Sequence, residues 1–146
     1  MRNACLVVAV SASCLVPASP VASGTQEFQV VVNPSVRGTW ISRASLTAVF
    51  TGKTDRWGDK GVAKPVDQSA KSPVRHAFTA SVLGRSMGEI QRYWQDRVAA
   101  DRVFPPPIRS SDEEILQFVA ATTGAVGYVS ADTAVPESVK VISIVD

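Results

Sequence analysis

The sequence predicts an α/β fold in which helices pack on a sheet of short, buried strands. Short apolar runs alternate along the chain with segments whose apolar residues recur at helical spacing. Capping residues or glycines bound most of the helical segments and separate them from the strands. Such alternation is typical of an α/β sandwich. The sequence contains no internal repeat.

The first predicted strand is Phe28–Val32, a continuous apolar run of the kind found in strands that are covered on both faces. A helix is expected from about Ser42 to Phe50, with Gly52 as its stop. The polar turn that follows carries one large aromatic residue, Trp57. We expect this side chain to fill the core under the turn, and stacking on a ligand is the alternative.

The next predicted unit is a strand at Val62–Val66, a polar loop, and a helix from Ser72 to about Leu83. Ser72 is a good N-cap residue, and Pro73 stands at the first helical position, where a missing N–H costs nothing. Gly84 closes this helix.

Two capping boxes, Ser86–Glu89 and Ser111–Glu114, open the last two predicted helices. A stiff, extended connector at Pro105–Pro107 lies between them. The final strands are predicted at Ala125–Val129 and Val139–Val145. Three aromatic side chains are expected to be largely buried, namely Trp57, Trp94 and Phe118.

Residues 1–23 are typical of a secretory signal peptide. Arg2 gives a positive start, Ala4–Val16 is an apolar run too short to span a bilayer, and Val21–Ser23 supplies the small residues of a cleavage site. We therefore expect residues 24–146 to form a single domain that is exported to the periplasm or secreted. No later apolar run reaches membrane-spanning length, so no membrane span is expected after cleavage.

Both cysteines, Cys5 and Cys14, fall inside the predicted leader, so the mature chain would contain none. This excludes disulfides, thiolate metal sites and a cysteine nucleophile from the mature domain. Attachment of a lipid to Cys14 is disfavoured, because Ser11 stands three positions upstream, where a leucine-like residue is expected.

The composition of the mature chain also excludes several classes of function. Removing Arg2 leaves 14 Lys and Arg against 13 Asp and Glu, a balance that gives no general attraction to nucleic acid or membranes. His76 is the only histidine, which excludes a histidine metal cluster and a triad with a spare base. Glu113 and Glu114 invite a catalytic interpretation, but acids in a first helical turn usually complement the helix dipole. We expect a non-enzyme without a cofactor or metal.

Three segments carry a resemblance to a known family. Leu46–Trp57, Val66–Phe78 and Gly124–Val129 resemble, in order, the "L..IF.G....W", "SGT…F" and "GAIGYV" motifs of bacterial phosphate-binding proteins of ABC transporters. With the crossover strand at Val30–Asn33, the resemblance covers essentially the whole mature chain. It implies a three-layer α/β/α sandwich similar to one lobe of a type II periplasmic binding protein, and a role in phosphate transport.

The chain also departs from the family's pattern. Family members close two lobes around phosphate, and this chain resembles only the second lobe with its hinge strands. When Phe78 is aligned with the family's phenylalanine, Ser72-Pro73-Val74 falls on the family's Ser-Gly-Thr. Only the serine is kept, since Pro73 removes a backbone donor and Val74 removes a hydroxyl. Asp67-Gln68 stands where the family carries an arginine.

Two functions are therefore open. The first is a solute-binding domain for ABC-type transport that holds phosphate or another oxyanion weakly at Ser69, Ser72 and Arg75, beside Lys71 and the helix dipole. On residue types alone, a capped helix with solvated basic residues explains the same segment. The second function is a non-catalytic interaction or scaffold protein that keeps the lobe and has lost the ligand. A second chain or a dimer partner would complete the cleft in the first case.

We expect export to remove the leader and to leave an unlipidated N-terminus close to Gly24, because the segment has all three regions of a signal peptide. Intact-mass analysis of the periplasmic fraction measures this. A retained leader, or a diacylglyceryl mass on Cys14, would contradict the prediction.

Overall fold

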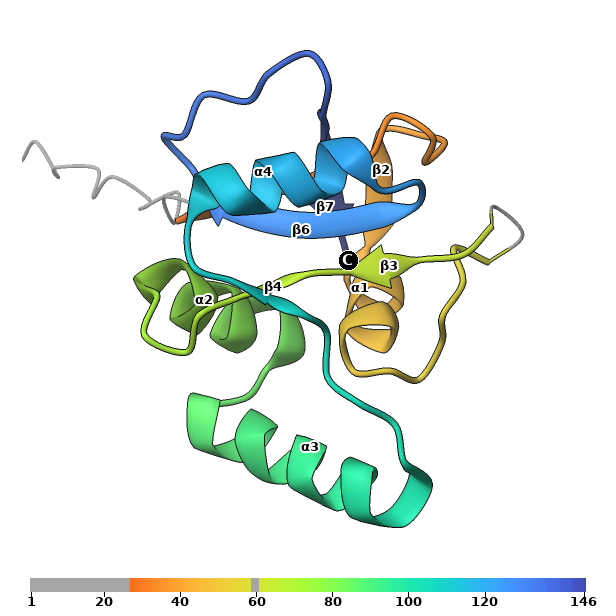
Figure 1. Cartoon of the computed structure of the whole chain (residues 1–146), viewed down its shortest axis with the longest axis vertical. Helices are drawn as coiled ribbons and strands as arrows, with labels where there is room; N and C mark the ends of the chain where they lie inside the picture. The colour runs from red at the N-terminus through yellow and green to blue at the C-terminus, as the bar shows by residue number, and fades with distance from the viewer. Residues whose placement is uncertain (1–26, 59–60) are drawn as a thin grey trace, which may run out of the picture.

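The structure, a computed structural model, describes residues 27–58 and 61–146, so the predicted signal peptide at 1–23 lies outside the described residues (Figure 1). Its strands form one five-stranded sheet and one separate pair. The elements in chain order are β1 (Phe28–Val32), β2 (Trp40–Ser42), α1 (Arg43–Phe50), β3 (Lys64–Pro65), β4 (Asp67–Gln68), α2 (Pro73–Phe78), the π-helical turn η1 (Thr79–Leu83), α3 (Met87–Asp101), β5 (Ile108–Arg109), α4 (Asp112–Ala121), β6 (Ala125–Ser130) and β7 (Lys140–Val145).

The main sheet has the strand order β2-β7-β1-β6-β3, with β1 at its centre. β1 pairs antiparallel with both β6 and β7, whereas β2 runs parallel to β7 and β3 runs parallel to β6. The sheet is therefore mixed, and β1 alone runs against the other four strands. β4 and β5 form a short parallel pair beside it.

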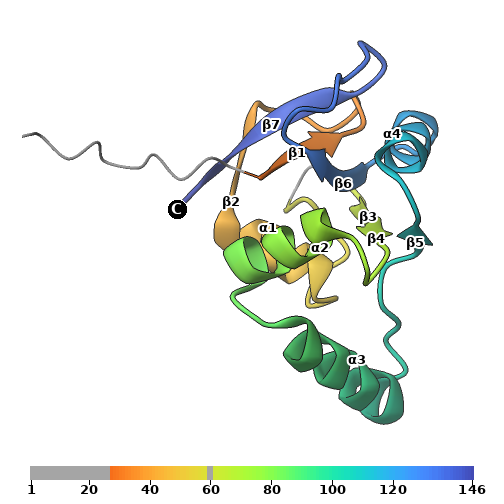
Figure 2. The same ribbon diagram turned by 90° about the vertical axis from the view of Figure 1, so that its left-hand side faces the viewer.

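Helices cover both faces of the sheet, as the sequence predicts. Figure 2 shows α4 on one side of β1 and β6, and α1 and α2 on the other side. Two clusters of buried apolar side chains fill these layers. Phe28, Val30 and Val32 contribute to the cluster under α1 and α2, whereas Val31 contributes to the cluster under α4. Because side chains alternate along a strand, the apolar run of β1 supplies both layers of the core.

Most predicted elements are confirmed. β1 matches the predicted strand, and α1 begins after its N-cap Ser42, whose hydroxyl accepts a hydrogen bond from the Ser45 N–H. The Ser86–Glu89 capping box is present with both of its hydrogen bonds. The second predicted capping box is half formed, because the Ser111 hydroxyl caps α4 while the Glu114 carboxylate binds Ser110 instead.

Trp57 fills the core as predicted. Its side chain is buried, and its indole N–H donates to the Gly124 carbonyl at 2.9 Å. Gly124 itself has a φ of +77°, and a side chain there would collide with the Val62 carbonyl, because an added Cβ would lie 2.1 Å from that oxygen. The glycine thus lets the strand that follows α4 approach the Trp57 turn.

Three predictions are wrong in detail. The strand predicted at Val62–Val66 is broken, because the chain leaves β6 after Pro65 and pairs with β5 instead. β2 was missed, since it is only three residues long and begins with the exposed Trp40. Phe118 is only partly buried: it packs against the core cluster under α4, and the Arg109 guanidinium lies over its ring, 5.0 Å from the ring centre.

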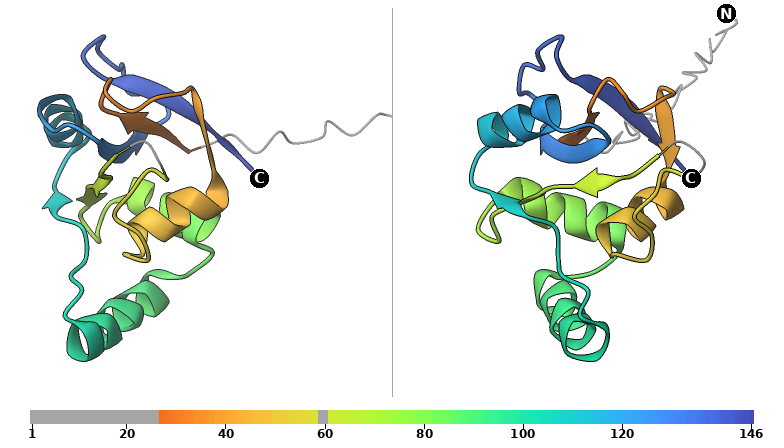
Figure 3. Two further views of the ribbon diagram at one scale, coloured as in Figure 1. Left: turned by 90° about the vertical axis from the view of Figure 1, so that its right-hand side faces the viewer. Right: turned by 45° about the vertical axis from the view of Figure 1, so that its right-hand side comes forward.

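α3 lies outside the sandwich, separated from the sheet by α1 and α2 (Figure 3). It docks on the C-terminal end of α1. The Trp94 ring lies against Gly52, where an added Cβ would be 3.1 Å from it. Tyr93 donates its hydroxyl to the Thr51 carbonyl at 2.6 Å, and Arg97 donates to the Gly52 carbonyl at 3.1 Å. Gly52 is therefore needed both for its φ of +68° and for the close approach of α3.

Trp94→Ala should destabilise the fold by about 3–5 kcal/mol, because it removes the buried ring that holds α3 on α1. Urea unfolding at pH 7 measures the loss. The exposed neighbour Gln95 provides the control, since Gln95→Ala should change the free energy of unfolding by less than about 0.5 kcal/mol. A loss below about 1 kcal/mol for Trp94→Ala would contradict this packing role.

Candidate functional site

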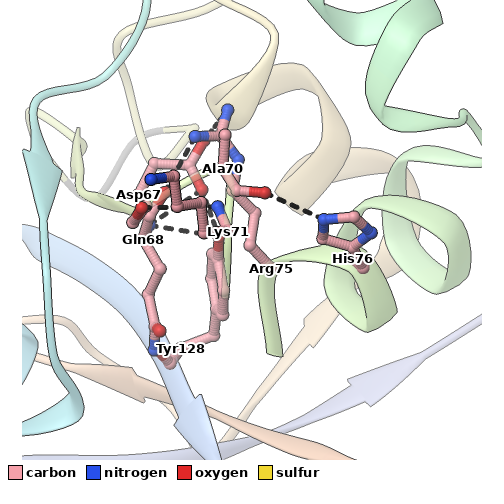
Figure 4. A network of polar contacts seen from close by, with 8 residues as sticks. Asp67, Gln68, Ala70, Lys71, Arg75, His76 and Tyr128 are labelled. Carbon is pink, nitrogen blue, oxygen red and sulfur yellow. Dashed lines mark hydrogen bonds and ion pairs between the residues drawn. The ribbon is translucent and has the colours of Figure 1, made fainter. Parts of the chain in front are cut away.

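The predicted anion site lies where β4 leads into α2, beside the end of β6 (Figure 4). A short loop, Ser69–Ser72, joins these elements. The Ser69 N–H donates to the Arg109 carbonyl on β5 at 3.1 Å, and the Ser72 N–H donates to the Ser69 carbonyl at 2.9 Å. The loop is thus held from both sides by backbone hydrogen bonds.

Ser72 occupies the N-cap position of α2, and Pro73 follows at the first helical position, as predicted. However, the Ser72 hydroxyl does not cap the helix. It donates instead to Gln68 Oε1 at 2.8 Å. The amide nitrogen of Gln68 donates to the Tyr128 carbonyl at 3.0 Å and to Asp112 at 2.7 Å, so its amide oxygen is left to accept from Ser72. The predicted capping role of this side chain is wrong for that reason.

The other loop residues also bind within the loop. The Ser69 hydroxyl accepts from the Lys71 N–H at 3.3 Å, and the Lys71 side chain is exposed. His76 donates a ring N–H to the Ala70 carbonyl at 2.8 Å. This histidine therefore supports the loop from the first turn of α2.

Arg75 points into the protein rather than toward solvent. One terminal nitrogen, Nη2, lies 3.3 Å from Asp67 Oδ2, and the other, Nη1, donates to the Gln68 carbonyl at 2.8 Å. The two charged side chains are only 9% and 10% exposed. The third guanidinium nitrogen of Arg75, Nε, is buried and has no hydrogen-bond partner among the residues that the structure describes. The cation that the sequence assigns to an external anion is thus paired with an internal carboxylate.

Tyr128 completes this buried cluster from β6. Its hydroxyl donates to Asp67 Oδ1, and its ring stacks on Phe78, with the ring centres 3.9 Å apart. Burial raises the pKa of Asp67, while Arg75, the Tyr128 hydroxyl and the Gln68 N–H partly offset this. Burial and the adjacent Asp67 carboxylate also raise the pKa of Tyr128, so its phenol remains a hydrogen-bond donor.

Asp112, at the start of α4, extends the network to the end of β6. It accepts hydrogen bonds from the Thr133 hydroxyl at 2.6 Å, the Gln68 amide at 2.7 Å and the Ser130 N–H at 3.1 Å. Burial acts to raise the pKa of Asp112, but these hydrogen bonds outweigh it and hold the pKa below its ordinary value. Asp112 is therefore ionised and ties three segments together.

The polar side chains of this cluster bind one another and backbone groups. Within residues 27–58 and 61–146, no group of three or more His, Cys, Asp or Glu residues could hold a metal ion. Glu113 is exposed in the first turn of α4, where an acid complements the helix dipole. In the same described ranges, no helix is long and apolar enough to cross a bilayer.

Sequence analysis missed the pairing of Asp67 with Arg75. Asp67 directly follows the buried Val66, and Arg75 lies three residues before the buried Phe78 on the same helix. Two opposite charges near buried apolar positions could have predicted this ion pair, because a buried charge needs a partner. Ser69 and Ser72 lie in the loop and Arg75 in the first turn of α2, and all three side chains have partners within the chain.

The fold is similar to solved phosphate-binding proteins. An ABC-type phosphate transport receptor from Vibrio cholerae superposes with a TM-score of 0.62 at 23% identity, over 81% of this chain and 46% of that one. PstS from Borrelia burgdorferi gives 0.62 at 15% identity, over 81% and 47%. A possible phosphate binding protein from Planctomyces limnophilus gives 0.59 at 18% identity, over 82% and 42%.

The chain thus spans less than half the length of each of these solved proteins. No family model matches the sequence, and no curated protein matches it either. The predicted α/β fold, similar to a single lobe of such binding proteins, is confirmed. At 15–23% identity the similarity establishes the fold alone, and it does not identify binding residues in this chain.

Removing either charge of the buried pair should destabilise the protein, because the remaining charge is left unpaired. Arg75→Met and Asp67→Asn should each cost about 3–5 kcal/mol in urea unfolding at pH 7. The free energy of unfolding of the double variant should fall by clearly less than the sum of the decreases in the two single variants.

The exposed ion pair of Arg97 with Asp101, at 2.9 Å, offers the control for this cycle. Asp101→Ala should cost less than about 1 kcal/mol, since exposed pairs contribute little. Strictly additive losses for Asp67 and Arg75 would show that their pairing is not what stabilises this corner.

Proposed function

We propose that this chain is a non-enzymatic solute-binding-type domain of phosphate-type ABC transport, acting outside the cytoplasm as one lobe that does not enclose an anion by itself. The similarity in fold to phosphate-binding proteins supports the transport role. One observation supports the second half of the proposal: Asp67 and the Gln68 carbonyl already occupy both terminal nitrogens of Arg75.

An oxyanion at this loop would therefore find few free donors. It would have to displace Asp67 to reach Arg75, and Gln68 to reach the Ser72 hydroxyl. Pro73 contributes no N–H, so the exposed Lys71 and the first free N–H groups of α2 remain.

The free energy available from these groups is small. An exposed helix end contributes about 0.3–1 kcal/mol toward an anion, and an exposed lysine adds a similar amount. A dissociation constant of 1 mM already requires about 4 kcal/mol. We infer that the isolated chain binds phosphate with a dissociation constant above about 1 mM, and that a second polypeptide, either another protein or another copy, supplies the missing wall of the cleft.

The second candidate function, an interaction or scaffold protein without any ligand, is favoured by the surroundings of Asp67. Its carboxylate accepts from the Tyr128 hydroxyl and the Gln68 N–H and pairs with Arg75, as a bound anion would. In this case the carboxylate permanently replaces a ligand. The two candidates differ in whether Arg75 can still be reached from solvent.

Calorimetric titration with phosphate, sulfate and glycerol distinguishes them. The wild-type monomer should show no saturable phosphate binding below about 1 mM. Asp67→Asn frees the Arg75 guanidinium and should bind phosphate at least about tenfold more tightly, provided that Arg75 can be reached.

Asp101→Asn removes an exposed acid and serves as the matched control, with unchanged phosphate binding. Circular dichroism must show that each variant is folded. No gain for folded Asp67→Asn would favour the scaffold function, whereas micromolar binding by the wild-type monomer would overturn the proposal. Micromolar binding that appears only with a dimer or a second protein would support a completed cleft.

A further inference from the structure

A separate cavity lies beside the edge strand β2 and α1, away from the residues of the candidate site. We propose that it binds a small organic anion with a flat apolar body, of the class of aromatic carboxylates. The cavity has a volume of about 570 Å³, within the range of about 300–1,000 Å³ typical of small-molecule sites. Its lining includes Arg37, Trp40, Val49, Arg56, Trp57 and Ile142.

The walls of this cavity are largely apolar. Trp57, Val49 and Ile142 are buried and belong to the core cluster under α1 and α2, so this part of the wall is fixed by packing. The Trp57 indole N–H already donates to the Gly124 carbonyl, which leaves its ring to contribute apolar surface. Such a wall suits a flat apolar group better than a small hydrated ion.

Trp40 lines the same cavity but is much more exposed to solvent than Trp57. Its side chain is 62% exposed, whereas Trp57 is 9% exposed. An exposed indole leaves a large apolar surface in water, and covering it with a second flat group is favourable. Trp40 begins β2, which is an edge strand of the main sheet in the part of the chain that the structure describes.

The charge of the lining indicates the sign of the ligand. Arg37 and Arg56 both line the cavity, and no acidic residue does so among the described lining residues. Neither arginine forms an ion pair with a carboxylate in the part of the chain that the structure describes. A guanidinium presents parallel N–H donors that match a carboxylate, and it also stacks on aromatic rings.

The remaining polar side chains of the lining have partners. The Ser42 and Ser45 hydroxyls bind each other at 2.8 Å, and the Thr54 hydroxyl accepts from the Arg56 N–H at 3.2 Å. The arginines are therefore the groups best placed to select a ligand by charge, while the tryptophans select it by shape. This site shares no residue with the Ser69–Ser72 loop and is independent of phosphate binding there.

Calorimetric titration of the full chain with benzoate and with 1-naphthoate tests the proposal. We expect one saturable site for at least one of these acids, with a dissociation constant below about 1 mM. The double variant Arg37→Ala/Arg56→Ala should weaken binding at least about tenfold, and Trp40→Ala should weaken it several-fold. Benzyl alcohol, which has the ring of benzoate without its charge, should bind at least about tenfold more weakly than benzoate.

Arg92→Ala provides the matched control, since Arg92 is an exposed arginine on α3 away from this cavity, and it should leave binding unchanged. Equal urea midpoints for all variants would show that the fold is intact. The proposal is overturned when neither acid binds a saturable site with a dissociation constant below about 1 mM, or when the double arginine variant binds as well as the wild type.

Discussion

A carboxylate inside a protein must be paired, and much of this structure follows from the burial of Asp67. The side chain sits between β6 and α2, where it meets the Tyr128 hydroxyl from one element and the Arg75 guanidinium from the other. This pairing sets the rotation of α2, because Arg75 must face the sheet. The adjacent Gln68 then holds the Ser72 hydroxyl and Asp112, so the loop and the start of α4 are fixed by the same network.

The same constraint explains why similarity in fold does not carry function with it. The chain superposes on phosphate-binding proteins over about four fifths of its length. In the segment that resembles their anion loop, however, the donors of this chain are directed toward its own side chains and carbonyls. Function depends on which groups remain free at a site, and a shared fold does not decide that.

Sequence patterns predicted those features that depend on neighbours along the chain. The Ser86–Glu89 capping box joins residues only three positions apart, so it could be predicted. The strand β1 could also be predicted, because a continuous apolar run indicates that the strand is buried. The partner of the Ser72 hydroxyl could not, because Gln68 is oriented by Tyr128, sixty positions later.

Two other features of the structure could not be predicted from local sequence patterns. The remaining exposure of Phe118 is limited by Arg109, which covers its ring and whose position is set by the pairing of β5 with β4. The cavity beside Trp40 is lined by α1, by the segments before and after it, and by Ile142 of β7, and its shape depends on how these segments pack. Local periodicity thus predicted most elements, whereas the side-chain partners at the Asp67 cluster depended on contacts between distant segments.

The position of α3 outside the sandwich has a consequence for how this protein can change over evolutionary time. The helix is attached to the end of α1 through Tyr93, Trp94 and Arg97. A residue with a left-handed backbone conformation lies on each side of the helix, Gly84 with φ +61° and Arg102 with φ +54°. Its length and outer face are therefore uncoupled from the register of the sheet. Insertions, deletions and new surface chemistry can accumulate there while the layers beneath keep their packing.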